Sequence, residues 1–240
     1  NKQFKQLEDG IRNLAKTIPV GTTELNNLAG QAGALGIARK DLIKFTKTAA
    51  ELGIATDMSS EQAANALARL SNVMGTSSKD FRRLGSTFVK LGNDGASTEA
   101  EIAAMALRLA KTGNQVGLSE AQVLSFSSAL ASVGVEAEAG GSAFSRAFIT
   151  MAEAVDEGND KLAGFAEVSG VSTREFARAF EANAAKTMVA FTEGLGKLES
   201  QGESVFATLK TLDLDEIRVR DSLLGAAGAG KLFNEQLKTG

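Results

Sequence analysis

The chain has 240 residues, of which 43% are hydrophobic and 23% charged, a balance typical of a globular protein long enough to bury a core. Its 26 basic and 29 acidic residues give a net charge of −3 and form no run of like charge, which argues against a nucleic-acid site. Because it contains no Cys, His, Trp or Tyr, hydrolases that use a catalytic His or Cys are excluded, as are zinc sites built from those residues. No stretch reaches the ~20 apolar residues that a transmembrane segment needs.

The opening segment, Lys2 to Thr17, has the pattern of a helix that ends before Pro19, because proline cannot continue a helix. The sequence starts at Asn1 inside this pattern and shows no signal peptide. We therefore expect residues 1–20 to form an N-terminal helix that continues from an upstream segment.

Five segments begin with Ser or Thr followed three residues later by Glu, Gln or Asp. Such a pair can satisfy free N–H groups at the start of a helix. The five pairs are Ser59/Gln62, Ser77/Asp80, Thr98/Glu101, Ser119/Gln122 and Ser172/Glu175. They predict five helix starts.

Helix ends are indicated by a glycine followed by an apolar residue, because glycine readily takes the left-handed conformation that closes a helix. The pairs are Gly36-Ile37, Gly53-Ile54, Gly117-Leu118, Gly134-Val135 and Gly170-Val171. Between starts and ends, apolar residues recur at helical spacing. The main stripes are Leu42/Phe45/Ala49/Leu52, Ala63/Leu67/Leu70/Met74, Phe81/Leu84/Phe88/Leu91, Ile102/Met105/Ala106/Leu109, Val123/Phe126/Leu130/Val133 and Met188/Phe191/Leu195/Leu198. Leu107 does not fit its stripe.

No region alternates with the period of a strand, and helices recur roughly every 20 residues from Arg39 to Gly134, which favours antiparallel neighbours. The sequence thus predicts an all-α fold: a multi-helix bundle or short stack of antiparallel amphipathic helices joined by short Gly/Ser/Thr-capped turns. We expect a helical core over residues 21–230 with a sub-boundary near 158–171. Residues 231–240 are expected to begin a helix that leads into downstream sequence.

The segment GAAGAGKL, Gly225 to Leu232, has the glycines and the lysine of a phosphate-binding loop at the right spacing. Leu232, however, stands where the magnesium-binding Ser or Thr is needed, and a predicted helix precedes the loop where a buried strand is required. A helix break with close packing over small residues is the preferred interpretation.

Carboxylates at Glu136/Glu138 and at Asp213/Asp215/Glu216 could serve acid–base chemistry on a sugar, but nothing in the sequence indicates a cleft, and helix starts attract acidic residues. The segment DEGND, Asp156 to Asp160, lacks the spacing of a calcium loop and is expected to be a solvated turn. We predict no catalytic residue, no metal ligand and no cofactor.

Two further features have structural interpretations. Asn93-Asp94-Gly95 is a strong turn signal, and the pair Gly140-Gly141 indicates either a turn or a close approach of two backbones. The 13 Phe residues are the sole aromatics and mostly lie on apolar stripes, so we expect them in the core.

Five segments of the chain have a distinctive sequence. They cover 48–93, 101–144, 170–180, 190–198 and the LLGAAGAG that ends at Gly230, and the most distinctive pieces are LGIATDMSSEQAA, NQVGLSEAQ and GVEAEAGGSAF. Together these segments resemble the core region of phage tail tape measure proteins. The opening helix matches least. The resemblance implies a structural component of a phage or prophage-like tail that helps set tail length, sits in the tail lumen or at the tail tip, and takes part in tail assembly and genome delivery.

The resemblance also implies partners: tail tip or baseplate hub proteins, the tail tube protein, tail assembly chaperones, and further copies of the chain, with a trimer as one arrangement. The chain would be found in the virion, and in the host cytoplasm during assembly. Because many caps break this segment into short helices, we expect it to be a folded element of a longer protein whose long helices do the measuring. The alternative is a non-viral helical protein-binding module without catalytic activity.

Overall fold

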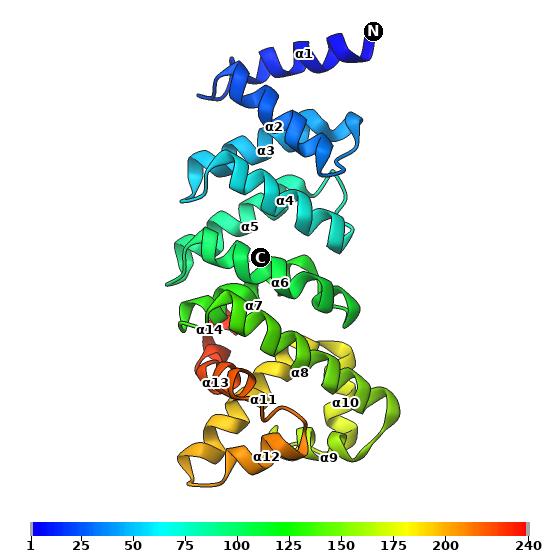
Figure 1. Cartoon of the computed structure of the whole chain (residues 1–240), viewed down its shortest axis with the longest axis vertical. Helices are drawn as coiled ribbons and strands as arrows, with labels where there is room; N and C mark the ends of the chain where they lie inside the picture. The colour runs from blue at the N-terminus through cyan, green and yellow to red at the C-terminus, as the bar shows by residue number, and fades with distance from the viewer. Residues whose placement is uncertain (1, 239–240) are drawn as a thin grey trace.

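The computed structural model describes residues 2–238, and within them the chain forms fourteen α-helices, one short 3₁₀ helix and no strand, which confirms the predicted all-α stack (Figure 1). The first eight are α1 Lys2–Leu14, α2 Thr22–Ala34, α3 Leu42–Ala55, α4 Ser60–Met74, α5 Phe81–Asp94, α6 Glu99–Gln115, α7 Glu120–Ser132 and α8 Ala137–Glu157, with the 3₁₀ helix Arg39–Asp41 before α3. The remaining six are α9 Asp160–Val168, α10 Thr173–Ala182, α11 Ala184–Ser200, α12 Val205–Thr211, α13 Ile217–Gly225 and α14 Ala229–Leu237. Residues 1, 239 and 240, which fall in the predicted terminal segments, lie outside the described residues.

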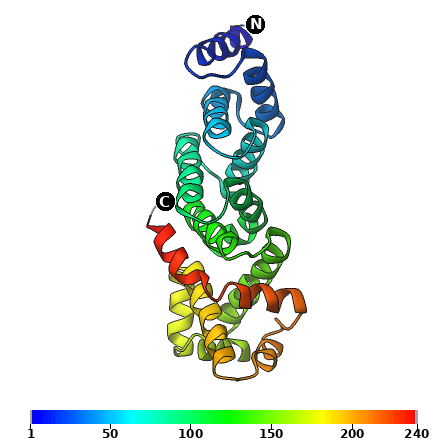
Figure 2. The same cartoon turned by 90° about the vertical axis from the view of Figure 1, so that its left-hand side faces the viewer.

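The first eight helices stack in two rows. Helices α1, α3, α5 and α7 form one row and α2, α4, α6 and α8 the other (Figure 2). Neighbours within each row pack together, and from α1 to α7 consecutive helices of the chain also pack together. Successive helices of the second row begin at residues 22, 60, 99 and 137, so a helical hairpin recurs every 38 or 39 residues. This is the arrangement of an α-solenoid, in which each layer contacts only the next.

The chain then leaves the stack and comes back. Helices α9 to α12 pack mainly against one another beyond α8, after which α13 packs on α8 and α14 packs on α7. The returning hairpin therefore takes the place of the next layer, α14 in the row of α7 and α13 in the row of α8 (Figures 1 and 2). The described chain ends beside the stack, near the middle of the molecule along its long axis (Figures 1 and 2).

Four of the five predicted helix starts are confirmed. At Ser59, Thr98, Ser119 and Ser172 the hydroxyl accepts from the third residue of the helix, whose side chain accepts in turn from the backbone N–H of the cap. The start at Ser77 was wrong: residues 77–80 form a turn and α5 begins at Phe81. The Asp80 carboxylate lies instead near Arg83, 3.6 Å from its Nη2 atom.

Four of the five predicted helix ends are also confirmed, because Gly36, Gly117, Gly134 and Gly170 have positive φ, and the N–H of the following residue bonds back to the last turn. The end at Gly53 was wrong, since this residue lies inside α3. A Cβ at Gly53 would come within 2.6 Å of the Cα of Ser60, so the glycine is explained by the close approach of the α4 start. The opening helix ends at Leu14, earlier than the predicted Thr17, and Pro19 lies in the connection to α2.

The predicted apolar stripes form one continuous core, with Met74, Val133 and Leu198 partly buried at its margin. Eleven of the 13 Phe side chains are buried, while Phe4 and Phe206 are exposed. Phe rings join neighbouring helices of a row: Phe45 meets Phe81 at 5.3 Å, and Phe126 meets Phe233 at 5.7 Å, both edge to face. The second pair anchors α14 on α7.

Candidate functional site

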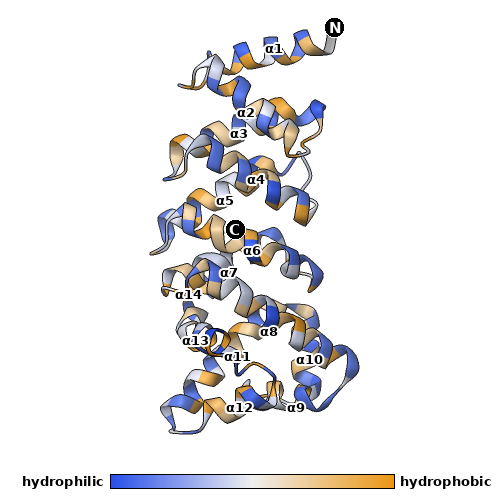
Figure 3. Cartoon of the chain, viewed as in Figure 1, coloured by the Kyte–Doolittle hydropathy of each residue, from blue (hydrophilic) through white to orange (hydrophobic). Residues whose placement is uncertain are grey.

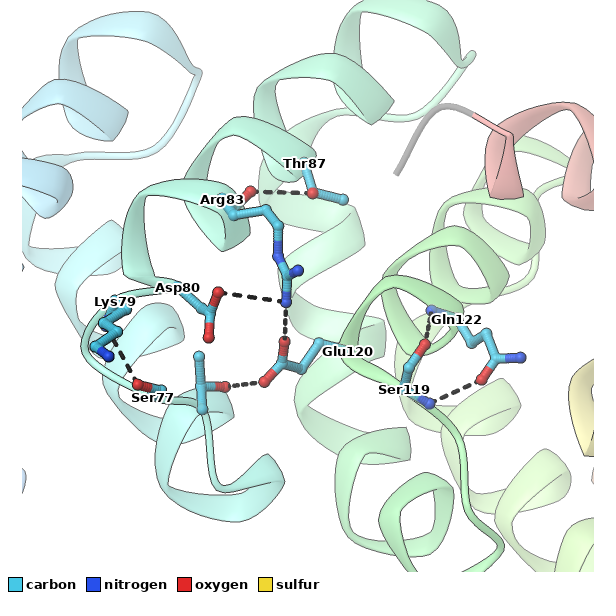
Figure 4. A network of polar contacts seen from close by, with 9 residues as sticks. Ser77, Lys79, Asp80, Arg83, Thr87, Ser119, Glu120 and Gln122 are labelled. Atoms are coloured by element: carbon cyan, nitrogen blue, oxygen red, sulfur yellow. Dashed lines mark hydrogen bonds and ion pairs between the residues drawn. The ribbon is translucent and has the colours of Figure 1, made fainter.

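Polar contacts between layers fix how one hairpin sits on the next. Glu120, the first residue of α7, accepts a hydrogen bond from Thr76 in the α4–α5 connection and lies 3.7 Å from Arg83 Nη2 on α5 (Figure 4). A carboxylate in the first turn is also favoured by the helix dipole. With 21% of its side chain exposed, Glu120 is the least exposed partner among the ion pairs of the described chain.

Two asparagines connect the helix ends of the second row. The Asn72 amide donates to the carbonyl of Leu35 at 2.6 Å, and the Asn114 amide donates to the carbonyl of Val73 at 3.0 Å. Helix C-termini leave their last carbonyls without intrahelical partners, so each asparagine satisfies one on the preceding helix of its row. These contacts restrain sliding between α2, α4 and α6.

At the opposite ends of the same helices, the Asp57 carboxylate accepts from the N–H of Ala100 at 3.0 Å and thereby helps to cap α6. Ser97, which precedes α6, joins α7 through a serine cluster, where its hydroxyl contacts the Ser128 hydroxyl at 3.3 Å and accepts from Ser132 at 3.2 Å. The junction between α4 and α6 is thus held by specific hydrogen bonds at both ends.

The acidic group Asp213/Asp215/Glu216 is divided between two basic partners. Asp213 pairs with Lys161 on α9, while Glu216 Oε2 lies 2.9 Å from Arg146 Nη1 on α8, and Arg146 also donates to the Asp213 carbonyl at 3.0 Å. The hydrogen bond from Lys161, and then its charge, lower the pKa of Asp213. Asp213 itself has a φ of 57°, the left-handed conformation that closes α12. The group ties the returning chain to α8 and α9.

The other predicted acidic segments lie at helix ends. Glu136 is the residue before α8 and Glu138 lies in its first turn. Asp156 to Asp160 spans the α8–α9 connection, where Gly158 closes α8 and Asn159 caps α9 by accepting from the N–H of Lys161 at 3.1 Å. Within residues 2–238 no three Asp or Glu side chains are grouped as a metal site would require.

The segment Gly225 to Leu232 spans the last residue of α13, the short turn 226–228 and the first residues of α14. The helix α13 precedes this turn, and the Lys231 side chain is 88% exposed, 3.9 Å from Glu235. A Cβ at Gly230 would overlap the Glu193 carboxylate on α11, so this glycine allows α14 to approach α11. The arrangement is a tight helical turn that leaves the lysine in solvent.

The glycine pair Gly140-Gly141 lies inside α8, so a turn at this position is wrong and the close approach is correct. A Cβ at Gly141 would come within 2.6 Å of Arg108 Cβ on α6, and one at Gly140 would overlap Val135. Of the turn predicted at Asn93-Asp94-Gly95, Asn93 and Asp94 lie in the last turn of α5, and only Gly95 follows the helix.

Sequence reasoning missed Asn72, Asn114 and the Arg83–Glu120 pair. The two asparagines do leave a signal in the sequence, because each lies near the end of its helix and the two helices start about 39 residues apart. Reading it requires knowledge that those helices are neighbours.

None of the helices in the part of the chain that the structure describes is long and apolar enough to span a membrane, and each mixes hydrophilic and hydrophobic residues (Figure 3).

Stacked helical hairpins held by caps and interlayer hydrogen bonds place the chain, by its architecture, in the class of α-solenoids. A family model described as phage-related minor tail protein matches residues 8–212, and the chain belongs to this family. It is therefore a phage tail protein, which favours the tail interpretation over a non-viral binding module. No curated protein and no solved structure matches the chain.

Proposed function

We propose that this chain is a folded segment of a tail tape measure protein, which helps to set tail length and takes part in tail assembly and genome delivery without catalysis of its own. The observation that carries the proposal is the family match over residues 8–212 together with the resemblance of segments spread along the same range. The segment would lie in the tail lumen or at the tail tip, and in the host cytoplasm before assembly.

The geometry supports a folded element within such a protein. The longest helix, α8, has 21 residues and spans about 31 Å. Because its short capped helices fold back on one another, this segment adds little to the length of the whole protein for each residue it contains. We propose that long helices elsewhere in the protein provide the measured length. In this arrangement residues 1–20 continue from an upstream helix, residues 21–230 form the folded core with a sub-boundary near 158–171, and residues 231–240 lead into a downstream helix.

The proposed partners are the tail tip or baseplate hub proteins, the tail tube protein and the tail assembly chaperones, with self-association as a trimer. A solenoid exposes a large surface for its size, and a surface of this kind can bind several partners one after another.

Mass spectrometry of purified tail particles tests the proposal directly. The tryptic peptide LGNDGASTEAEIAAMALR, residues 91–108, is expected to co-purify with tail-tube and tip proteins and to belong to a much longer polypeptide. Detection of the chain only as a free, short protein would overturn the tape measure proposal.

Tail length distinguishes a folded segment from an extended one. Deletion of one hairpin layer, about 39 residues, should shorten the tail by about 10 Å if the stack stays folded, since packed helices lie 8–10 Å apart. The same deletion should shorten the tail by about 60 Å if the segment runs as one helix in the tail. Electron microscopy of the tails separates the two results, and the larger change would contradict the folded element.

A further inference from the structure

A hollow of about 400 Å³ opens between α4 and α6 on the outer side of the second row. Its floor is apolar and made of Met58, Ala66, Ala103 and Leu107. Leu107, which does not fit the apolar stripe of its helix, has a place here, because it faces the hollow and is only partly buried.

A second hollow, of about 290 Å³, lies on the other side of α6, between α6 and the start of α8. Its apolar lining includes Ala131 and Val135, and it shares the exposed residue Ala104 with the first hollow. The two hollows and the alanine-covered surface of α6 between them are called the α6 trough. Short side chains on α6 leave its backbone open to close approach by another helix.

The α6 trough is acidic. Four carboxylates line it, Glu61 in the first hollow and Glu101, Glu136 and Glu138 in the second, and neither hollow is lined by Lys or Arg. Within residues 2–238 none of the four takes part in an ion pair. Glu101 accepts a hydrogen bond from the Thr98 N–H in the cap of α6, so Glu61, Glu136 and Glu138 are the carboxylates available to a cation that enters the trough.

We propose that the α6 trough binds a basic amphipathic helix of another protein. An apolar stripe at helical spacing would fill the two hollows, against Leu107 in the first and Val135 in the second, and Lys or Arg on its flanks would lie beside the carboxylates. The alanines allow the two helix axes to come near the short end of the usual 8–10 Å range. Charge pairing at the rim would accelerate association and make it sensitive to salt. This proposal is independent of the tape measure proposal.

Binding is tested with a synthetic helical peptide of about 18 residues, or five turns, that has Leu and Ala on one face and Lys on its flanks. The control peptide carries Glu in place of Lys. In isothermal titration calorimetry at low salt, the chain should bind the basic peptide and not the acidic one. Ala104→Trp, which fills the shared centre of the trough, should raise Kd by at least about tenfold. The matched variant Ala190→Trp, at an exposed alanine on α11, should leave Kd unchanged.

A second pair of variants tests the charges without changing the shape of the trough. Glu61→Gln with Glu138→Gln should raise Kd by about threefold at low salt and by less at high salt. Glu167→Gln with Glu181→Gln, at exposed carboxylates on α9 and α10, should have no effect. These charge variants decide the test if thermal unfolding shows that Ala104→Trp disturbs the fold.

Equal binding of the basic and acidic peptides would overturn the proposal, as would an unchanged Kd for both trough variants.

Analytical ultracentrifugation of the chain alone tests whether a second copy of the chain occupies the trough instead. The row of α3 and α5 exposes Lys44, Lys47, Arg82 and Lys90, so a second copy could present basic helices. Self-association that Ala104→Trp abolishes would assign the trough to a second copy and contradict the proposed partner.

Discussion

The two parts of the molecule, α1 to α8 and α9 to α14, are built from the same short capped helices but are assembled in different ways. In the first part every helix packs against helices close to it in the sequence, and the layers repeat about every 39 residues. In the second part the chain makes a four-helix excursion before α13 and α14 return to pack on α8 and α7. Local caps therefore define the helices in both parts, whereas long-range apolar contacts define the path only in the second.

This difference raises the question of whether the returning hairpin is an integral layer of the stack. Its anchor, Phe233, is fully buried, and its ring meets Phe126 as the ring of Phe81 meets Phe45 within the stack. The ion pairs of Arg146 and Lys161 add a polar attachment at the other end of the return. On this basis we expect α14 to unfold together with the stack.

The largest expected effect tests that expectation. Phe233→Ala and Phe45→Ala should each lower the free energy of unfolding by about 3–5 kcal/mol, because each leaves a large cavity beside a partner ring. Urea denaturation should show one transition for both variants. Phe206→Ala, at a half-exposed ring, is the control and should change little. Loss of α14 alone in Phe233→Ala, with the stack unfolding at the wild-type midpoint, would show that the return is only loosely attached.

Glycines at close approaches give the next largest effect. A Cβ at Gly194 would overlap the Val168 carbonyl oxygen, and a Cβ at Gly53 would meet the backbone of Ser60. Gly194→Ala and Gly53→Ala should each destabilise the fold by about 1–3 kcal/mol, since the backbone must shift. Gly30→Ala, at a helical position with open space, should stabilise it by about 0.4–1 kcal/mol. Chemical denaturation compares the three, and equal effects at all three would contradict close packing as the reason for these glycines.

Helix caps give a smaller effect that should be alike in both parts. Ser59→Ala in the stack and Ser172→Ala in the excursion should each cost about 1 kcal/mol, because each removes a hydroxyl that accepts from a free backbone N–H. Ser77→Ala should stay within about 0.5 kcal/mol, since Ser77 caps no helix. Thermal unfolding measures all three, and a cost at Ser77 as large as that at Ser59 would mean that the turn before α5 matters more than its contacts indicate.

The sequence was sufficient where the determining interaction is local. The starts at Thr98 and Ser119 and the ends at Gly36 and Gly134 depend on residues within one turn, so spacing alone predicted them. Ser77 failed because Asp80 is the weakest member of the capping pattern, and its carboxylate lies near Arg83 instead. Gly53 failed because a glycine required by a neighbouring helix has the same appearance in a sequence as one that ends a helix.

The return of α13 and α14 could not be predicted, because no local feature of Gly225 to Leu232 states which helix the segment will meet. The same reason hid the α6 trough. Its alanines and carboxylates are unremarkable along the sequence and become a surface only when α4, α6 and the start of α8 lie side by side. Glu136 and Glu138 were noticed in the sequence and Glu101 only as part of a helix cap, whereas Glu61 was not singled out. Which of them have partners depended on the packing.

The smallest expected effect concerns the charge of Asp213. Its pKa is lowered by Lys161 in the folded state, so the ionised form stabilises the fold above the unfolded pKa of about 3.9 and this contribution is lost as the pH falls through the folded pKa. Asp213→Asn keeps a side chain that tolerates the left-handed backbone and removes only the charge. The difference in urea midpoint between the two proteins should be constant between about pH 5 and 8, shrink below about pH 4, and decrease with added salt. Asp215→Asn, at a carboxylate outside the ion pairs, is the control. A difference that persists unchanged in acid would mean that Asp213 acts through the shape of the turn and that its ion pair contributes nothing to holding the returning chain.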